Sequence, residues 1–188
     1  DLKHFSKIFE AKEKLRWNNK FVVLSAGRLV LEKGILELLD AASRWNEKIT
    51  LAIAGTGPLE KTIFEHANKH NNIQYLGNID SAQMPLYYSA ADLLIIPSVH
   101  EEGFGRIILE SLACGTPVIG SNRGAIPEAM DNSVGKIIKI SPDNIKKAVE
   151  NLYTDKKTLS FFAKNCRNFA KIRYGENNAL TIIESYSK

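Results

Sequence analysis

The sequence predicts an α/β protein with a Rossmann-like parallel sheet of about six strands, helices on both faces and further helices at the C-terminal end. Six short apolar runs, most of them bounded by Gly, Pro, Asn or Asp, have the character of buried strands. Amphipathic stretches with apolar residues at helical spacing lie between these runs. This alternation favours right-handed crossovers and a ligand at the carboxyl ends of the strands, near a topological switch.

The expected strands follow one another from the first quarter of the chain onward. They are Phe21–Ala26, Ile49–Ala54, Ile73–Leu76, Leu93–Ile96, Pro117–Gly120 and Gly135–Ile138. Helical spacing lies between them at 35–42, 59–67 and 84–88. After Pro142 only helices are expected, at 143–153, 155–172 and 176–187.

Length and composition fit one globular domain with a full core, since the chain has 188 residues of which 44% are hydrophobic. No run approaches the roughly 18 to 20 apolar residues that a transmembrane helix needs, and the first residues lack the apolar stretch of a signal peptide. Cys114 and Cys166 have no second ligand at metal-binding spacing, so we expect buried thiols in a reducing compartment. A cytoplasmic protein is therefore expected.

The net charge of +4 is modest, but Lys and Arg are concentrated between residues 7 and 20 and between residues 146 and 173. A solvated face explains this pattern, and contact with anionic lipid or with another protein domain is the alternative. Nucleic acid is not an expected partner because no aromatic residues interleave a basic patch.

The stretch from Pro97 to Glu110 carries two glutamates eight positions apart around a glycine-rich turn. Gly103 and Gly105 remove side chains where a ligand would approach the backbone, and the helix expected to follow would aim free N–H groups at an anion. Glu102 lies at the mouth of the turn, whereas Glu110 lies later on the helix and can accept hydrogen bonds from hydroxyls. A ligand with phosphate groups that bind at the turn and hydroxyl groups that bind the two carboxylates is a sugar nucleotide, so the stretch predicts a site for one.

A second loop, Gly27–Gly34, follows the first expected strand and carries Arg28 and Lys33 five positions apart. Arg can fork across two phosphate oxygens while Lys supplies a point charge, so the pair can neutralise a leaving nucleoside diphosphate. The alternative is a surface loop with an adjacent Glu32 and Lys33 charge pair.

Two more turns follow the second and third expected strands. Gly55 and Gly57 form a turn before a helix that Pro58 is expected to start. This turn lacks the third glycine of a dinucleotide fingerprint, so on its own it is a weak sign of a phosphate site. The turn after the third strand precedes a helix that Asp80 or Ser81 is expected to cap.

Taken in order, these segments resemble the group 1, or family four, retaining glycosyltransferases, which have the two-domain GT-B fold. Glu102 and Glu110 match the E-x7-E pattern of that family, and matching motifs extend from about Phe5 to Gly135. The matching segments are Gly27–Gly34, Gly55–Pro58, Leu76–Asp80, Glu110–Ile119 and Gly124–Glu128. Ala125 replaces the second glycine of the family's Gly-Gly-x-Pro-Glu, and Arg106 stands where the family often has an apolar residue.

The resemblance implies that residues 1–188 form the nucleotide-sugar-binding half of a GT-B enzyme, whose N-terminal acceptor domain is not in this chain. It implies transfer of a sugar from a UDP- or GDP-linked donor with retention at the anomeric carbon. Arg28 and Lys33 would bind the diphosphate, Glu110 the ribose hydroxyls, and Glu102 the sugar and phosphate. The other donor-binding residues implied are Gly27, Gly55, Gly57, Ile79, Gly103, Phe104 and Gly105, and the family pattern makes Tyr87 and Tyr88 packing residues.

No metal or other cofactor is implied, because no Asp-x-Asp pair occurs and the two cations can take the role of a divalent ion. The isolated domain is expected to bind its donor but turn over poorly, and family habit suggests polysaccharide or glycolipid synthesis at the cytoplasmic face of a membrane. Two other classes remain open. A nucleotide-sugar epimerase would convert free donor without an acceptor, and a non-enzymatic interaction module with vestigial phosphate loops would bind no nucleotide.

Overall fold

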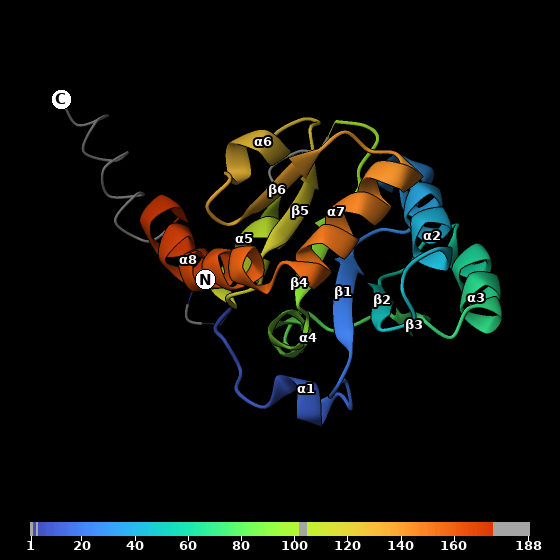
Figure 1. Ribbon diagram of the computed structural model, residues 1–188, viewed down its shortest axis with the longest axis horizontal. Coiled ribbons are helices and arrows are strands. Elements are labelled where there is room, and N and C mark those ends of the chain that lie inside the picture. The colour runs from blue at the N-terminus through green and yellow to red at the C-terminus, as the bar shows by residue number, and fades with distance from the viewer. Residues whose placement is uncertain (1, 3, 102–104, 175–188) are drawn as a thin grey trace.

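The computed structural model describes residues 2, 4–101 and 105–174 and contains one sheet of six strands (Figure 1). The strands are β1 (Phe21–Ala26), β2 (Ile49–Ala54), β3 (Ile73–Gly77), β4 (Leu93–Ile96), β5 (Val118–Ser121) and β6 (Gly135–Ile138). Their order across the sheet is β3-β2-β1-β4-β5-β6, and every neighbouring pair is parallel. The strand order reverses between β1 and β4, and sheets of this kind bind ligands at such a switch.

Helices and one 3₁₀ turn connect the strands. They are α1 (Ala11–Lys14), η1 (Leu31–Lys33), α2 (Ile35–Ser43), α3 (Glu60–Lys69), α4 (Met84–Ala90), α5 (Arg106–Ala113), α6 (Ile126–Ala129), α7 (Pro142–Thr154) and α8 (Lys156–Tyr174). Within the described ranges, no helix is both long and apolar enough to cross a membrane.

The two layers of helices follow from the alternation of side chains along each strand. On β1, Val22 and Leu24 pack with α1, α4, α5 and the second half of α8, whereas Val23 packs on the other face with α2, α3 and α7. β4 alternates in the same way, with Leu94 on the first side and Leu93 on the second. Both faces of the sheet are therefore covered, which explains why the inner strands β1, β2, β4 and β5 are almost entirely buried, whereas the edge strands β3 and β6 are only partly buried.

The predicted sheet is confirmed, and four of the six strands have the predicted bounds. β3 extends one residue further, and β5 runs one residue later than predicted because Pro117 has no N–H to donate to a ladder. α7 begins at Pro142, with Ser141 as its N-cap, whose hydroxyl accepts a hydrogen bond from the Asn144 amide. The helix expected at 176–187 lies outside the described residues.

Two expected helix starts are wrong. Pro58 does not begin α3, which starts at Glu60, because the Glu60 carboxylate reaches back to the Gly57 amide and closes a turn first. The N-cap of α4 is Gln83, not Asp80 or Ser81, because the Asp80 side chain instead accepts from the Ala82 amide within the preceding turn.

Candidate functional site

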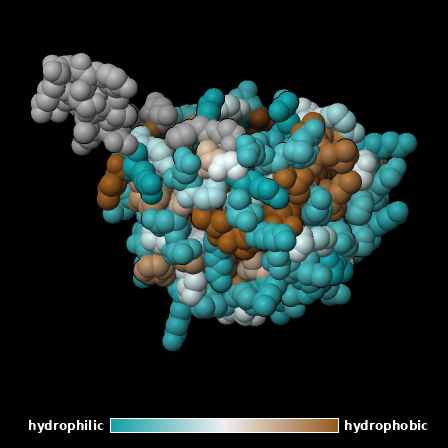
Figure 2. All heavy atoms as spheres, turned by 90° about the horizontal axis from the view of Figure 1, so that it is seen from above, coloured by the Kyte–Doolittle hydropathy of each residue, from teal (hydrophilic) through white to brown (hydrophobic). Residues whose placement is uncertain are grey.

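Two adjoining cavities lie at the carboxyl edge of the sheet, beside the switch between β1 and β4. Their volumes are about 210 and 330 Å³, and both are lined by Ala26, Gly27, Arg28 and Ile107. Figure 2 looks onto this edge from above and shows a band of hydrophobic surface across its middle, bordered by hydrophilic residues. The two cavities together form one composite cleft, which we call the carboxyl-edge cleft.

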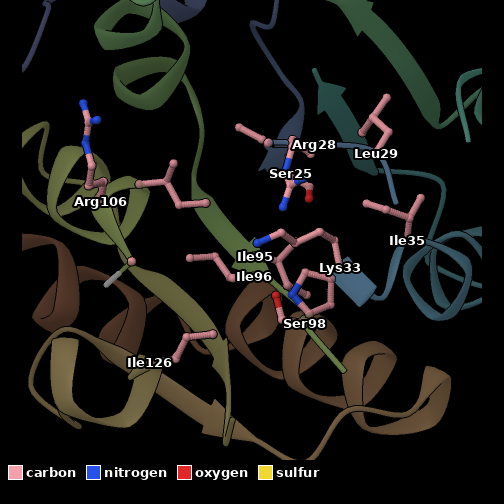
Figure 3. Close-up of a pocket in the computed structure, with 15 residues that line it drawn as sticks. Ser25, Arg28, Leu29, Lys33, Ile35, Ile95, Ile96, Ser98, Arg106 and Ile126 are labelled. Carbon is pink, nitrogen blue, oxygen red and sulfur yellow. The ribbon is translucent and has the colours of Figure 1, made fainter. Parts of the chain in front are cut away.

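The first cavity holds the two cations that the sequence singled out. Arg28 from the loop after β1 and Lys33 from η1 both line it and extend toward its middle (Figure 3). Arg106 lines the opposite wall, with its guanidinium turned away from the centre. The walls are mainly apolar, from Leu29, Ile35, Ile95, Ile96, Ile107 and Ile126.

This lining favours an anion. Two cations, Arg28 and Lys33, extend into the first cavity, and within the part of the chain that the structure describes no Asp or Glu lines it. Apolar walls lower the local dielectric constant, so each cation attracts an anion more strongly there than at an open surface. A phosphate group between Arg28 and Lys33 would therefore be held by charge and shielded from water on the isoleucine side.

The second cavity contains the predicted helix glutamate. Glu110 lines it together with Gly55, Ile79 and Tyr88, so four chain segments converge here. The Tyr88 hydroxyl donates a hydrogen bond to Glu110 Oε2 at 3.0 Å, and Arg106 Nη2 lies 3.8 Å from Oε1. The Glu110 side chain is 16% exposed, so one carboxylate edge still faces the cleft.

Burial raises the pKa of Glu110 above its ordinary value, and the hydrogen bond from Tyr88 and the charge of Arg106 oppose that rise. Burial also raises the pKa of Tyr88, with the charge of Glu110 adding to the effect. Tyr88 therefore stays a hydrogen-bond donor at any ordinary pH. The hydrogen bond from Tyr88 fixes the orientation of the Glu110 carboxylate. The remaining lone pairs of that carboxylate can accept hydrogen bonds from ligand hydroxyls.

Close backbone contacts lock the loops of the cleft together. A Cβ on Gly34 would lie 1.9 Å from the Pro97 carbonyl oxygen, and a Cβ on Gly55 would lie 1.8 Å from that of Gly27. Both glycines have positive φ, of 65° and 131°. Hydrogen bonds add to this, since the Val99 amide donates to Glu32 and the Leu29 amide to Thr56. Only glycine permits these approaches.

The structure brings most of the predicted site residues together at this edge. Arg28, Lys33, Gly27, Gly55, Ile79, Gly105 and Glu110 all line one or both cavities. Gly57 lines neither cavity, because it packs against the backbone of Leu29. Glu102, Gly103 and Phe104 lie outside the described residues.

Several lining residues were not predicted. Tyr88 is fully buried, in agreement with a packing role, but its hydroxyl also donates a hydrogen bond to Glu110, which lines the cleft. Ser25 and Ser98 place small polar groups in the first cavity although they are only 5% and 2% exposed. A serine at or just after the end of an apolar strand could have predicted that Ser25 and Ser98 lie at the cleft.

A family model for glycosyl transferases group 1 matches residues 7–169. The chain belongs to this family. A curated relative of Methanocaldococcus jannaschii, an uncharacterized glycosyltransferase, is 30% identical over 164 residues, which is 84% of this chain and 42% of the relative. An uncharacterized 41.2 kDa protein in the cps region of Klebsiella pneumoniae is 31% identical over 132 residues, 66% of this chain and 35% of that protein. The chain thus spans well under half the length of these relatives.

Solved structures of glycosyltransferases share the fold. The TM-score is 0.86 to a sucrose-phosphate synthase from Thermosynechococcus elongatus, at 26% identity over all of this chain and 50% of that one. It is 0.87 to the HepE protein of Anabaena in complex with UDP and glucose, at 23% identity over 100% and 55% of the two chains. The C-terminal domain of a group 1 family protein from Francisella tularensis matches at 0.80 and 24% identity, over 94% of this chain and 98% of that domain. This group 1 chain thus has the Rossmann-like fold of one half of the GT-B glycosyltransferases.

Proposed function

We propose that this chain is the donor-binding domain of a retaining glycosyltransferase that uses a UDP- or GDP-linked sugar, and that the diphosphate lies between Arg28 and Lys33. The convergence of these two cations in one apolar-walled cavity, next to a second cavity that contains Glu110, is the observation that carries the proposal. The solved relative that binds UDP and glucose supports a nucleotide sugar as the ligand.

Each part of the donor then has a partner of matching chemistry. Glu110 accepts hydrogen bonds from the ribose hydroxyls, and the backbone around Ile79 receives the base at the far end of the second cavity. The diphosphate leaves with extra negative charge when the glycosidic bond breaks, and Arg28 and Lys33 stabilise that charge without a metal ion. Glu102, with Gly103, Phe104 and Gly105, completes the sugar end in this proposal.

The acceptor site belongs, in this proposal, to an N-terminal domain of the parent enzyme, so the isolated chain binds donor but turns it over poorly. The parent acts in the cytoplasm, and two buried free cysteines in the described part of the chain are consistent with a reducing compartment. Polysaccharide or glycolipid assembly is the pathway class that we propose.

Calorimetric titration of the chain with UDP, GDP, ADP and their common sugar conjugates tests the proposal. We expect saturable binding of one nucleotide, weakened about tenfold or more in Arg28→Ala, since a charge-assisted hydrogen bond contributes about 1.5–3 kcal/mol. Glu110→Ala should weaken binding in the same way. Lys61→Ala, an exposed lysine on α3 away from the cleft, is the matched control and should leave the affinity unchanged.

Other outcomes favour the other classes. No heat with any nucleotide contradicts the proposal and favours an interaction module. Conversion of a free nucleotide sugar to its epimer, with no acceptor present, favours an epimerase instead.

A further inference from the structure

Two more cavities adjoin at the amino edge of the sheet, opposite the carboxyl-edge cleft. One, of about 410 Å³, lies between residues 7–12 and the first turns of α8, and the other, of about 240 Å³, lies beside the start of β1. Lys12, Asp92 and Lys156 line both, so the two are continuous. We call them together the amino-edge groove.

Five lysines line this groove against two carboxylates, those of Glu10 and Asp92. The lysines are Lys7, Lys12, Lys20, Lys48 and Lys156. The Lys12 ammonium lies 2.6 Å from Asp92 Oδ2, and the same oxygen accepts from the Val22 amide at 2.8 Å. The charge of Asp92 is therefore already balanced inside the protein, and the remaining lysines are in excess.

The smaller cavity holds most of that excess. The ammonium of Lys156 lies 4.7 Å from the centre of the Phe21 ring and 4.6 Å from that of Tyr153, and these rings keep it at the cavity without neutralising it. Lys20 and Lys48 line the same cavity, and within the described ranges neither side chain has an ion pair. Three positive charges thus converge on a space large enough for a phosphate group.

The groove also lies where the charge of the chain is concentrated. Residues 7–20 contain five Lys or Arg and two Glu, and α8 contains six Lys or Arg and no acidic residue. The rest of the chain has 14 basic and 19 acidic residues, so these two segments are strongly positive on a molecule that is otherwise negative. Such a charge distribution orients the molecule in front of an anionic surface.

Apolar groups lie beside the lysines. Ile8, Phe9, Leu159 and Ala163 line the larger cavity, and Phe9 is 80% exposed on its rim. Exposed aromatic rings among lysines are typical of proteins that bind the interface of a bilayer with anionic lipids.

We propose that the amino-edge groove binds an anionic membrane surface. Lipid phosphates lie against Lys20, Lys48 and Lys156, and Phe9 enters the headgroup region. Because the groove and the carboxyl-edge cleft lie at opposite edges of the sheet, the cleft stays open to water when the groove is occupied. The proposal does not depend on what the cleft binds.

Flotation with vesicles of phosphatidylcholine, with and without phosphatidylglycerol, tests the proposal. We expect the chain to bind only the anionic vesicles, less at high salt. Lys20→Glu combined with Lys48→Glu should weaken binding at least about 30-fold, since each basic residue near the surface contributes about 1 kcal/mol. Phe9→Asp should also weaken it.

Matched controls lie on α3, where Lys61→Glu combined with Lys69→Glu makes the same change in charge and Phe64→Asp the same change at a ring that is 56% exposed. These variants should bind anionic vesicles several-fold better than the groove variants. Equal binding by the two sets, equal binding to neutral vesicles, or no binding at all would overturn the proposal. So would binding of inorganic phosphate by the chain without binding to vesicles, which would make the groove a site for a soluble anion.

Thermal unfolding confirms that each variant is folded, and nucleotide titration of the groove variants separates this proposal from the one for the cleft. A groove variant that loses vesicles but keeps nucleotide affinity supports both. A chain that binds vesicles but no nucleotide supports the groove alone.

Discussion

The hydroxyl of Tyr88, a fully buried residue of α4, donates a hydrogen bond to Glu110 Oε2 on α5 at 3.0 Å. The backbone carbonyl of Tyr88 in turn accepts from the Thr116 hydroxyl at 2.6 Å, and the Thr116 carbonyl accepts from the Ser111 hydroxyl. A chain of buried hydrogen bonds thus joins the two helices behind the cleft. It holds the carboxylate of Glu110 in one orientation.

Tyr88→Phe removes this hydrogen bond and little else. Because a hydrogen bond to a charged group contributes about 1.5–3 kcal/mol, we expect nucleotide affinity to fall about tenfold, as the carboxylate loses its fixed orientation. Titration calorimetry measures the change. Tyr87→Phe is the control, since the hydroxyl of Tyr87 makes no hydrogen bond within the described residues while its ring packs against Trp17. Equal losses in the two variants would show that Tyr88 acts only through packing.

Glu110→Gln should raise the stability of the chain at neutral pH. Burial raises the pKa of Glu110 above its ordinary value of 4.5. The protonated Glu110 side chain therefore contributes fully to the stability of the folded chain below pH 4.5, and this contribution is lost as the pH rises through the folded-state pKa and the buried carboxyl becomes charged. Glutamine stays neutral throughout. The melting temperature of the variant should therefore exceed that of the wild type at pH 7, and the difference should shrink at pH 4. A difference that grew toward acid would contradict the raised pKa.

Gly34→Ala should destabilise the chain more than Gly77→Ala. Both glycines have positive φ, near 65° and 70°, where a side chain costs about 1–2 kcal/mol. A Cβ on Gly77 meets no atom within 4 Å, whereas one on Gly34 would collide with the Pro97 carbonyl. Urea unfolding should show a loss of about 1 kcal/mol for Gly77→Ala and at least about 3 kcal/mol for Gly34→Ala. Similar losses would mean that the loop moves to admit the methyl group.

The two cysteines should be inert in the folded chain. Cys114 and Cys166 are 1% and 0% exposed, and burial raises the pKa of each to about 12. At pH 8 both therefore stay protonated and shielded, so a thiol reagent should label them only on unfolding. Labelling rates with and without denaturant measure this. Fast labelling of Cys166 without denaturant would show that α8 opens from the sheet, because Cys166 lies on the buried face of that helix.

The inner strands of the sheet could be predicted well because they are buried on both faces. Val22 and Val23 point to opposite sides and are both fully buried, so the run is apolar at every position and its limits are clear in the sequence. Helix starts were harder to predict. Glu60 and Asp80 bind nearby backbone amides in turns, and such local competition with a cap leaves no periodic signal.

The cleft could be predicted in part. Arg28 and Lys33 lie on a loop after a strand, where sequence order alone places them at the carboxyl edge. The contact of Tyr88 with Glu110 depends on how α4 packs against α5, across 22 residues of chain, and the contribution of Ile126 depends on α6. These are tertiary contacts, which residue spacing does not encode. The roles of Glu102, Gly103 and Phe104 stay predictions.

The backbone contact of Gly34 with Pro97 joins the two sides of the strand switch before any ligand arrives, and that of Gly55 with Gly27 joins the loops after β1 and β2. The conformational entropy of shaping this edge is thus lost when the chain folds and not when a ligand binds. Ligand binding to such a preformed edge requires little ordering of the backbone. The heat capacity change of binding should therefore reflect the apolar surface that the ligand covers and not coupled folding. Ligand affinity and thermal stability therefore depend on the same backbone contacts, so we expect ligand binding to be lost at the temperature at which the chain unfolds.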